Sequence, residues 1–494
     1  MAAGARDVDV IVAGGGPAGS TLAWDLARRG VRVLVLERTR FPREKVCGDY
    51  VEPRGLRILQ RMGCLEQLEE QTPLPITHST TVVDWRRRYV GEIPFYGGSD
   101  RLPPHGYIIP RDRLDDAMLQ AAERQGASVH QQTLVTAVHA ASTGVEVEAR
   151  RGGRRLRYRS RLIAGADGAN SVVGTSAGVL VDDPRYTAVA QRAYAAGIEG
   201  DRGEAAFFFE EKLFPGYGWM FPLAGGRANV GVGILSETRR RLGVNVPELL
   251  FEFVERLRRF QPGCARLELC SSPLGGIVRT YGGAGHNYFD GGVLVGDAGS
   301  FVDPMTGEGI TPAAESALLA APVLQDALEA RRFDAEQLAP FETAFRAYFD
   351  PAMTFLDLCA CILRNRTLAP PWLKALARGC ELAQAEPAFA EGGGGYFGGL
   401  DVRPFGILAH IWTRVAGDVV LAGPRSFGAL LRQRGSNATT VGDLVAWQAA
   451  WLRSLAADPL WHARWTMDVQ RKSVRVLSRL QPTAADPRAA GLFD

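Results

Sequence analysis

Two apolar runs with a helical pattern between them open the chain. The runs Val8–Ala13 and Val31–Leu36 are rich in Val, Ile and Leu, which predicts two buried strands. An Ala- and Leu-rich stretch between them predicts a helix, which is expected to end at Arg29-Gly30. The order strand, helix, strand over residues 7–38 is typical of the first βαβ unit of a parallel α/β sheet.

Further along the chain, the hydrophobic pattern alternates between strand and helix periods. Strand-like patterns cover residues 76–95 and 186–234, and a hairpin pair is predicted around Gly152-Gly153, with its arms at 133–149 and 154–163. Helical patterns cover residues 55–65, 114–124, 246–259 and 310–328, and everything from residue 334 to the end. We expect the sheet of residues 186–234 to cover one face of a ligand.

The composition is that of an ordinary globular protein. The 494 residues exceed one typical domain, so two or three subdomains are expected, and 46% of the residues are hydrophobic. A net charge of +3 is too small to indicate a nucleic-acid partner. The seven cysteines form no Cys-x-x-Cys pair and no cluster with metal-ligand spacing, which fits a reduced cytoplasmic protein without a structural metal. We expect no signal peptide and no membrane span.

The turn after the first strand carries the spacing G-x-G-x-x-G at Gly14, Gly16 and Gly19. Between a strand and a helix, these glycines permit a tight turn, a close approach of a pyrophosphate, and close packing of helix on strand. The helix N-terminus favours an anion. Glu37 closes the second strand, where its carboxylate can accept hydrogen bonds from the two hydroxyls of an adenosine ribose. These features predict a dinucleotide site, with an ordinary glycine-rich turn as the alternative.

Other motifs are weaker when taken alone. Arg111 precedes a predicted helix and is either a phosphate or flavin contact or a solvated charge, while residues 41–50 have the spacing of a surface connection. Asp167 follows a strand in an Asp-Gly turn. Asp297 follows the strand predicted at 291–295, and open α/β sheets bind ligands at the carboxyl ends of their strands.

The segment from residue 401 to the end combines aromatic and basic residues. It holds 12 Lys or Arg against 7 Asp, and five of the nine tryptophans: Trp412, Trp447, Trp451, Trp461 and Trp465. This pattern predicts either a helix lying on a membrane surface or a helical cap that packs its aromatics onto the core. The cap is the favoured interpretation because the aromatics do not form one helical stripe.

Taken in order, these motifs resemble those of the geranylgeranyl reductase family, which lies in the flavoprotein superfamily of p-hydroxybenzoate hydroxylase-type monooxygenases and flavin-dependent halogenases. The resemblance covers about residues 7–330. It depends on the glycine turn with Glu37, the FPREKVCGD loop, Arg111 before Leu114-Asp115, GADGANS, YGWMFP followed by ANVGVG, and GDAGSFVDPMTGEGI.

The resemblance implies FAD, bound non-covalently in an extended conformation. It assigns the cofactor to Gly14, Gly16, Gly19, Glu37, Arg38, Arg111, Asp167, Asp297, Pro304, Gly307 and Gly309. Cys47 matches a cysteine that family members place close to the flavin, which makes it the candidate catalytic residue. The substrate cavity is assigned to Tyr50, Tyr217, Trp219 and Phe221.

Three features depart from the family pattern. Gly174 stands where the superfamily usually has an arginine, which argues against direct handling of NAD(P)H. Tyr50 replaces a small residue after CGD and is expected to reshape the space above the flavin. The segment after residue 400 is long for a prenyl reductase, so the three together suggest a tailoring enzyme with its own substrate. Residues 217–222 only partly match the halogenase tryptophan motif, and no lysine can be assigned the halogenating role.

The resemblance implies an α/β fold, in which a Rossmann-like FAD-binding domain is interleaved with a β-sheet substrate domain and followed by a helical C-terminal region. The FAD-binding domain is expected at 1–75, 105–180 and 285–333, the substrate-binding sheet at 76–104 and 181–284, and the helical region at 334–494.

The expected activity is that of an FAD-dependent oxidoreductase acting on a large lipophilic substrate with a C=C bond, an isoprenoid or a polyketide. Reduction by flavin hydride is favoured over epoxidation or hydroxylation through a flavin C4a-hydroperoxide in secondary metabolism. A non-catalytic prenyl-binding protein is the third hypothesis, and the retention of Gly14, Gly16, Glu37 and Asp297 argues against it. The electrons are expected from NAD(P)H or from a reductase or ferredoxin. The expected location is the cytoplasm, with peripheral contact to a membrane through the C-terminal region as an alternative.

Overall fold

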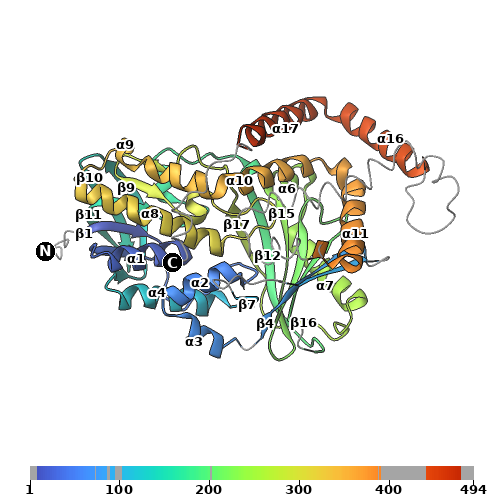
Figure 1. The fold of residues 1–494 in the computed structure, drawn as a ribbon, viewed down its shortest axis with the longest axis horizontal. Coiled ribbons are helices and arrows are strands. Elements are labelled where there is room, and N and C mark those ends of the chain that lie inside the picture. The colour runs from blue at the N-terminus through green and yellow to red at the C-terminus, as the bar shows by residue number, and fades with distance from the viewer. Residues whose placement is uncertain are drawn as a thin grey trace.

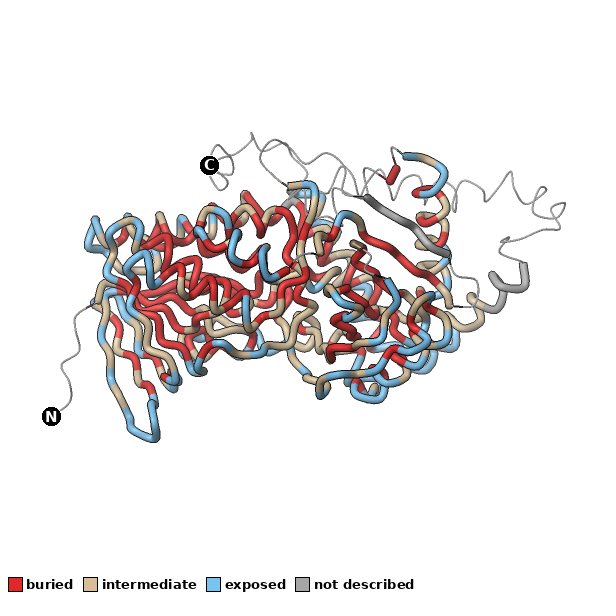
Figure 2. Tube along the Cα trace, turned by 90° about the horizontal axis from the view of Figure 1, so that it is seen from below, coloured by how far each residue is buried: buried red, intermediate tan, exposed pale blue. Residues whose placement is uncertain are grey.

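The computed structural model describes residues 8–72, 74–85, 89–94, 103–200, 203–387, 389–390 and 441–479. Trp412 lies outside the described residues. Figure 1 shows two sheets side by side, with long helices crossing above both. Figure 2 shows that the most deeply buried chain follows the first sheet and the helices packed on it.

The first sheet is the expected parallel sheet of the α/β fold. Its parallel strands follow the order β19, β11, β1, β2, β8, and β18 pairs antiparallel with β19. The strands are β1 (Val8–Ala13), β2 (Val33–Leu36), β8 (Ser128–His130), β11 (Arg154–Gly165), β18 (Tyr288–Phe289) and β19 (Gly292–Leu294). Because helices and strands cover both faces, the central strand β1 is a continuous buried apolar run from Val10 to Ala13 rather than an alternating one.

Helices cover one face of this sheet and a strand meander covers the other. A shared apolar core joins α1 (Pro17–Arg28), α2 (Pro53–Arg61), α4 (Arg111–Arg124), α8 (Ile310–Ala330) and α10 (Pro340–Leu363). The other face packs against β9 (Thr133–Ala141), β10 (Gly144–Arg151) and α5 (Val172–Ser176). The parallel sheet therefore presents the carboxyl ends of its strands beside the start of α1.

The second sheet is mostly antiparallel and runs in the order β16, β12, β15, β14, β13, β5, β6, with β17 also paired to β12. Its strands are β5 (His78–Val83), β6 (Tyr89–Pro94), β12 (Thr187–Ala196), β13 (Glu204–Phe209), β14 (Tyr217–Leu223), β15 (Arg227–Leu235), β16 (Glu268–Leu269) and β17 (Leu274–Arg279). One face packs against α7 (Val246–Phe260). The opposite face carries Phe207, Trp219 and Phe221 toward the first sheet.

Smaller elements connect these layers. A third sheet joins β3 (Tyr50–Val51), β7 (Gly106–Ile108) and β4 (Pro75–Ile76). The remaining described helices are α3 (Leu65–Glu70), α6 (Ser236–Leu242), α9 (Ala335–Leu338), α11 (Ala369–Ala385), α16 (Val441–Ala457) and α17 (Pro459–Arg479), with 3-10 turns η1 (Pro184–Tyr186), η2 (Gly296–Gly299) and η3 (Arg366–Leu368). Figure 1 shows α17 lying over α10. None of the helices within the described residues is both long and apolar enough to cross a bilayer.

Two predicted elements were wrong in detail. The strand predicted at 133–149 is two strands, because Gly144 has a φ of +142° and the chain turns back before it. The helix predicted at 55–65 is split into α2 and α3, because Gly63 takes a φ of +67° and ends the first of them.

Candidate active site

The glycine turn between β1 and α1 is shaped by close backbone contacts. Gly14 has a φ of +101°, and a Cβ there would lie 2.4 Å from the carbonyl oxygen of Ala166. A Cβ on Gly19 would lie 1.9 Å from the carbonyl oxygen of Gly14. Packing therefore requires both glycines. At Gly16 the nearest described atom, Arg43 Nη2, is 3.7 Å from the Cβ position, so this backbone is open to a ligand.

Glu37 holds this turn in place. Its Oε2 accepts a hydrogen bond from the Gly15 N–H at 2.8 Å, and its Oε1 accepts from the Thr39 N–H at 2.8 Å and the Thr39 hydroxyl at 2.5 Å. A carboxylate offers about four lone-pair sites, so roughly one remains for a ribose hydroxyl rather than the two expected. Arg38, next to it, is exposed.

Two arginines share one buried carboxylate beside the turn. Arg111 donates to Asp115 through Nε at 2.7 Å and Nη2 at 2.8 Å, and Arg43 Nη1 lies 3.0 Å from the same carboxylate. The group carries a net positive charge next to the start of α1. Arg111 is 4% exposed, so its alternative interpretation as a solvated charge was wrong.

These features fit FAD. The open backbone at Gly16, the N-terminus of α1, which has no side-chain cap, and the net positive charge of the arginine pair suit a diphosphate. Asp297 lies beside the same turn. The preceding residue, Gly296 of η2, has a φ of +60°, and a Cβ added to it would lie only 2.8 Å from the Cβ of Ala18 in α1. Asp297 and Lys45 lie 3.7 Å apart at its edge.

Asp167 lies under the glycine turn, where a Cβ on Gly14 would be 3.1 Å from its Cα. Its carboxylate accepts hydrogen bonds from the Ser171 hydroxyl at 2.5 Å and from the N–H groups of Val172 at 2.7 Å and Val173 at 3.2 Å. It therefore caps α5 and fixes the backbone under Gly14. Burial raises the pKa of the Asp167 carboxyl, and the hydrogen bonds from Ser171 and the backbone oppose that shift.

A cavity of about 250 Å³ lies between the two sheets. Pro17, Asp297 and the loop of residues 303–309, which includes Pro304, Gly307 and Gly309, form one part of its wall. The predicted residues Cys47, Tyr50, Tyr217, Trp219 and Phe221 also line it. The loop of residues 41–50 is thus a cavity wall in its second half, and its interpretation as a surface connection was wrong there.

The apolar wall comes from the second sheet and from α10. The α10 residues include Phe349, Met353, Leu356, Ala360 and Leu363, spaced four and three apart so that they form one helical face. Sheet residues facing them include Phe207, Trp219, Phe221, Ile234 and Val278. The cavity thus joins the proposed FAD cradle to a surface suited to a hydrocarbon chain.

Cys47 is fixed through its own loop. Its carbonyl oxygen accepts a hydrogen bond from Asn229 Nδ2 at 2.8 Å, and its Sγ accepts one from the Asp49 N–H at 3.3 Å. Burial raises the pKa of the Cys47 thiol, and the nearby Arg111 charge opposes that shift. At neutral pH the thiol is therefore protonated and faces the cavity.

Asp49 joins this loop to the second sheet. It is 0% exposed, has a φ of +66°, and its Oδ2 accepts from the Tyr194 hydroxyl at 2.6 Å and from Asn229 Nδ2 at 2.8 Å. Its other oxygen has no hydrogen-bond partner among the described residues. Burial raises the pKa of Asp49 from 3.8 to about 6.

A group of buried acids forms the polar part of the cavity wall. Arg54 lies 3.1 Å from Glu52 and 2.5 Å from Glu315. Glu308 accepts from the Thr311 N–H at 2.9 Å, and its other oxygen has no partner among the described residues. Burial raises the pKa of Glu52 to about 7 and that of Glu308 well above its usual value. One or both of these acids is therefore neutral at pH 7.

Tyr50 and Tyr217 are both held in place at the cavity. The rings of Tyr50 and Phe221 are 6.1 Å apart, and a Cβ on Gly106 would lie 2.6 Å from Tyr50 Cε2, so Gly106 makes room for the tyrosine. The Tyr217 hydroxyl donates to the carbonyl of Thr306, which ties β14 to the 303–309 loop.

The sequence prediction missed Asp49, Asn229, Tyr194 and the acids around Arg54. Glu315 had a readable signal, because it is a charged residue inside the small apolar segment 310–328. Asp49 followed Cys47 in a motif already quoted, yet its partners Tyr194 and Asn229 are 145 and 180 positions away in the sequence.

Comparison with known families and proteins identifies two domains in the chain. Residues 7–195 match the FAD binding domain and residues 187–265 match the geranylgeranyl reductase catalytic domain. The chain is 34% identical over 326 residues to a menaquinone reductase of Mycolicibacterium smegmatis. The aligned residues cover 64% of this chain and 76% of the relative. It is 30% identical over 346 residues to a digeranylgeranylglycerophospholipid reductase of Methanococcoides burtonii, covering 69% and 80%.

Solved structures share the fold. A geranylgeranyl bacteriochlorophyll reductase-like protein of Thermoplasma acidophilum superposes with a TM-score of 0.67 and 22% identity, covering 77% of this chain and 92% of that one. The flavin-dependent halogenase CmlS superposes with a TM-score of 0.62 and 24% identity, covering 72% and 64%. At these identities the likeness shows the fold alone.

The expected fold class, FAD dependence and enzyme class are confirmed by these matches. The glycine turn and Glu37 lie inside the matched FAD binding domain, and the matched catalytic domain includes strands β12 to β15 of the second sheet. The chain therefore belongs to the geranylgeranyl reductase family of FAD-dependent oxidoreductases.

Proposed function

We propose that this enzyme reduces C=C bonds in the isoprenoid chain of a lipid. The observation that carries the proposal is the cavity whose wall includes both Asp297 beside the glycine turn and the apolar face of α10. The relatives are named as reductases of menaquinone and of digeranylgeranylglycerophospholipid, and both of these lipids carry isoprenoid chains.

FAD, when bound, supplies hydride chemistry. Gly16, the start of α1 and Arg43 would hold its diphosphate, and Glu37 would hold its ribose. Asp297 and the loop of residues 303–309 would position the flavin against the cavity. The apolar face of α10 and the aromatic residues of β14 would orient the chain and exclude water from it.

Reduction of an alkene needs a proton as well as a hydride. The Cys47 thiol faces the cavity in its protonated form, and its loop is fixed by Asn229, so we assign it as the proton donor. Glu52 and Glu308 are the rival donors, because both line the cavity and burial favours their neutral forms. Removal of each group in turn separates the two assignments.

The electron donor is proposed to be a separate reductase or a ferredoxin rather than free NAD(P)H. A Cβ on Gly174 would lie 2.6 Å from Leu180 Cγ, so close packing leaves no room for the arginine usual at this place. The guanidinium near this segment comes instead from Arg279 of β17, which donates to the carbonyls of Ala169 at 3.2 Å and Val181 at 2.8 Å. Both contacts hold it against backbone.

Anaerobic turnover tests the reaction. The purified protein is reduced with dithionite, mixed with menaquinone or digeranylgeranylglycerophospholipid without oxygen, and the lipid is analysed by mass spectrometry. We expect two hydrogens to be added per reduced double bond. Products that form only after oxygen is admitted, and that contain oxygen, would instead assign the enzyme as a monooxygenase. We further propose that the enzyme meets its lipid at a membrane surface, through its C-terminal helices.

A further inference from the structure

The last described helix, α17, has two chemically different faces. Its inner face packs on α10, and an adjacent side of α10 lines the cavity. Trp465 donates through Nε1 to the carbonyl of Cys361 on α10 at 2.8 Å, and Lys472 pairs with Asp357 of the same helix. These contacts confirm the cap interpretation for the tryptophans that face inward.

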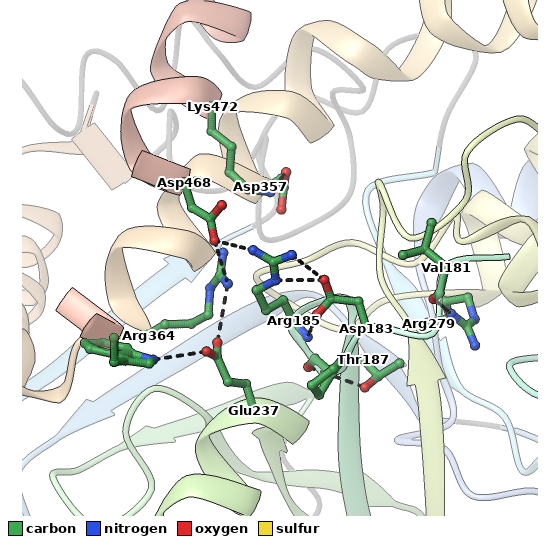
Figure 3. Close-up of polar contacts among 12 residues, drawn as sticks. Val181, Asp183, Arg185, Thr187, Glu237, Arg279, Asp357, Arg364, Asp468 and Lys472 are labelled. Carbon is green, nitrogen blue, oxygen red and sulfur yellow. Dashed lines mark hydrogen bonds and ion pairs between the residues drawn. The ribbon is translucent and has the colours of Figure 1, made fainter. Parts of the chain in front are cut away.

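Charged groups fix the same inner face, as Figure 3 shows. Asp468 lies 2.5 Å from Arg185 and 3.9 Å from Arg364, and Arg364 pairs with Glu237 at 3.3 Å. Trp461 donates to Glu237 as well, at 3.1 Å. The orientation of α17 is therefore set, and the same residues must always face outward.

The outer face is apolar along its centre. Leu460, Met467 and Val474 are seven residues apart and 74%, 46% and 67% exposed, and Leu477 continues the line at 66%. In the described part of the chain, six of the eleven exposed large apolar side chains lie on α16 and α17: these four with Leu452 and Leu455. So strong a concentration on two adjacent helices marks an interaction surface.

Arginines flank this apolar line, and the acids point elsewhere. Arg464, Arg471 and Arg475 are exposed on α17. Asp468 is held in the inner network, and Asp458 caps the helix by accepting from the Trp461 N–H at 3.0 Å. In the described part of α17 the outer face is thus apolar and positive. Such a helix lies in the headgroup region of a bilayer and is attracted by anionic lipids.

We propose that the outer face of α17, formed by Leu460, Met467, Val474 and Leu477 with Arg464, Arg471 and Arg475, docks the enzyme onto an anionic lipid bilayer. Only α10 would then separate the membrane-bound helix from the cavity, so a lipid substrate would have a short path. This proposal rests on the proposed function. Vesicle binding is measured without turnover, so the docking proposal and the proposed reductase activity can each fail independently of the other.

Co-sedimentation of the full FAD-loaded chain with sucrose-loaded vesicles tests the proposal. The vesicles contain phosphatidylcholine alone or with one third phosphatidylglycerol. We expect binding to the mixed vesicles, weaker binding to phosphatidylcholine, and a strong loss in high salt. The variant Arg464→Gln/Arg471→Gln/Arg475→Gln should bind about a hundredfold more weakly, because each arginine near the surface contributes roughly fivefold. Met467→Ser/Val474→Ser should also weaken binding.

Matched controls use exposed residues elsewhere. Arg157→Gln/Arg159→Gln/Arg161→Gln on β11 removes the same charge from side chains that are 72%, 73% and 50% exposed, and Phe251→Ser on α7 removes an apolar side chain that is 52% exposed. Both controls should bind as the unchanged protein does. Equal loss in the controls, or equal binding to both vesicle types, would overturn the proposal. So would a finding by light scattering that the α17 variants break a dimer while the unchanged protein ignores vesicles.

Discussion

Replacement of Asp49 by Asn should stabilise the protein at alkaline pH. The carboxyl is 0% exposed, and burial raises its pKa from 3.8 to about 6. A group whose pKa rises on folding binds its proton more tightly in the folded state, so stability falls as the pH rises from about 4 to about 6. Above that range the ionised carboxylate costs about 3 kcal/mol, from about 1.36 kcal/mol per pH unit.

Asparagine fits this position without that cost. It is neutral at every pH, tolerates the left-handed φ of +66°, and its oxygen can accept the bonds from Tyr194 and Asn229. We expect Asp49→Asn to be more stable by up to about 3 kcal/mol at pH 8. Its advantage should shrink by about 1.4 kcal/mol at pH 5, because the native carboxyl is then largely protonated.

Urea unfolding of both proteins at pH 8 and pH 5, followed by tryptophan fluorescence, measures this double difference. The other titrating groups are common to both proteins and cancel. Tyr194→Phe serves as a second perturbation: it removes a donor to the ionised form, so its destabilisation should be larger at pH 8 than at pH 5. A stability difference between Asp49→Asn and the native protein that does not change with pH would refute the reasoning.

Three further predictions concern the cofactor and the chemistry. Glu37→Ala should weaken FAD binding and loosen the turn, since hydrogen bonds to a charged group contribute about 1.5–3 kcal/mol each; FAD affinity by fluorescence titration that stays unchanged would remove Glu37 from the ribose site. Cys47→Ala should slow alkene reduction by roughly 10² to 10⁴ with flavin reduction unchanged, and single-turnover rates near the native value would leave Glu52 or Glu308 as the donor. Stopped-flow reduction by NADPH should be slower than turnover with a partner reductase, and the reverse order would contradict the role given to Gly174.

Local features of the sequence were predictable. The glycine turn and Glu37 depend on contacts within a strand, a turn and a helix that follow one another, so their spacing carries the information. The resemblance in motif order added the FAD and the family. The bonds that the Asp167 carboxylate accepts at the start of α5 were not predictable from that resemblance.

The rest of the site depends on distant parts of the chain. The acids around Arg54 come from separate parts of the chain: Glu52 immediately precedes α2, and Glu315 lies in α8. The sequence of α10 predicts only a buried helix. No pattern within residues 340–363 indicates that its apolar face lines a cavity. The exposed apolar residues of α17 were not predicted, because the tryptophans of the same helix are apolar too and no single helical stripe could be recognised. The structure shows that the two sets lie on different faces.

Anaerobic single turnover in deuterated water tests the central claim most directly. The reduced protein is mixed with an isoprenoid lipid, the flavin spectrum is followed, and the product is analysed by mass spectrometry. The account predicts that flavin oxidation and alkene reduction occur together without oxygen. Each reduced bond should carry two solvent deuteriums, because the hydrogen that reduced flavin transfers exchanges with solvent and the added proton also comes from solvent. Flavin that stays reduced until oxygen is admitted, followed by a product one oxygen atom heavier, would contradict it.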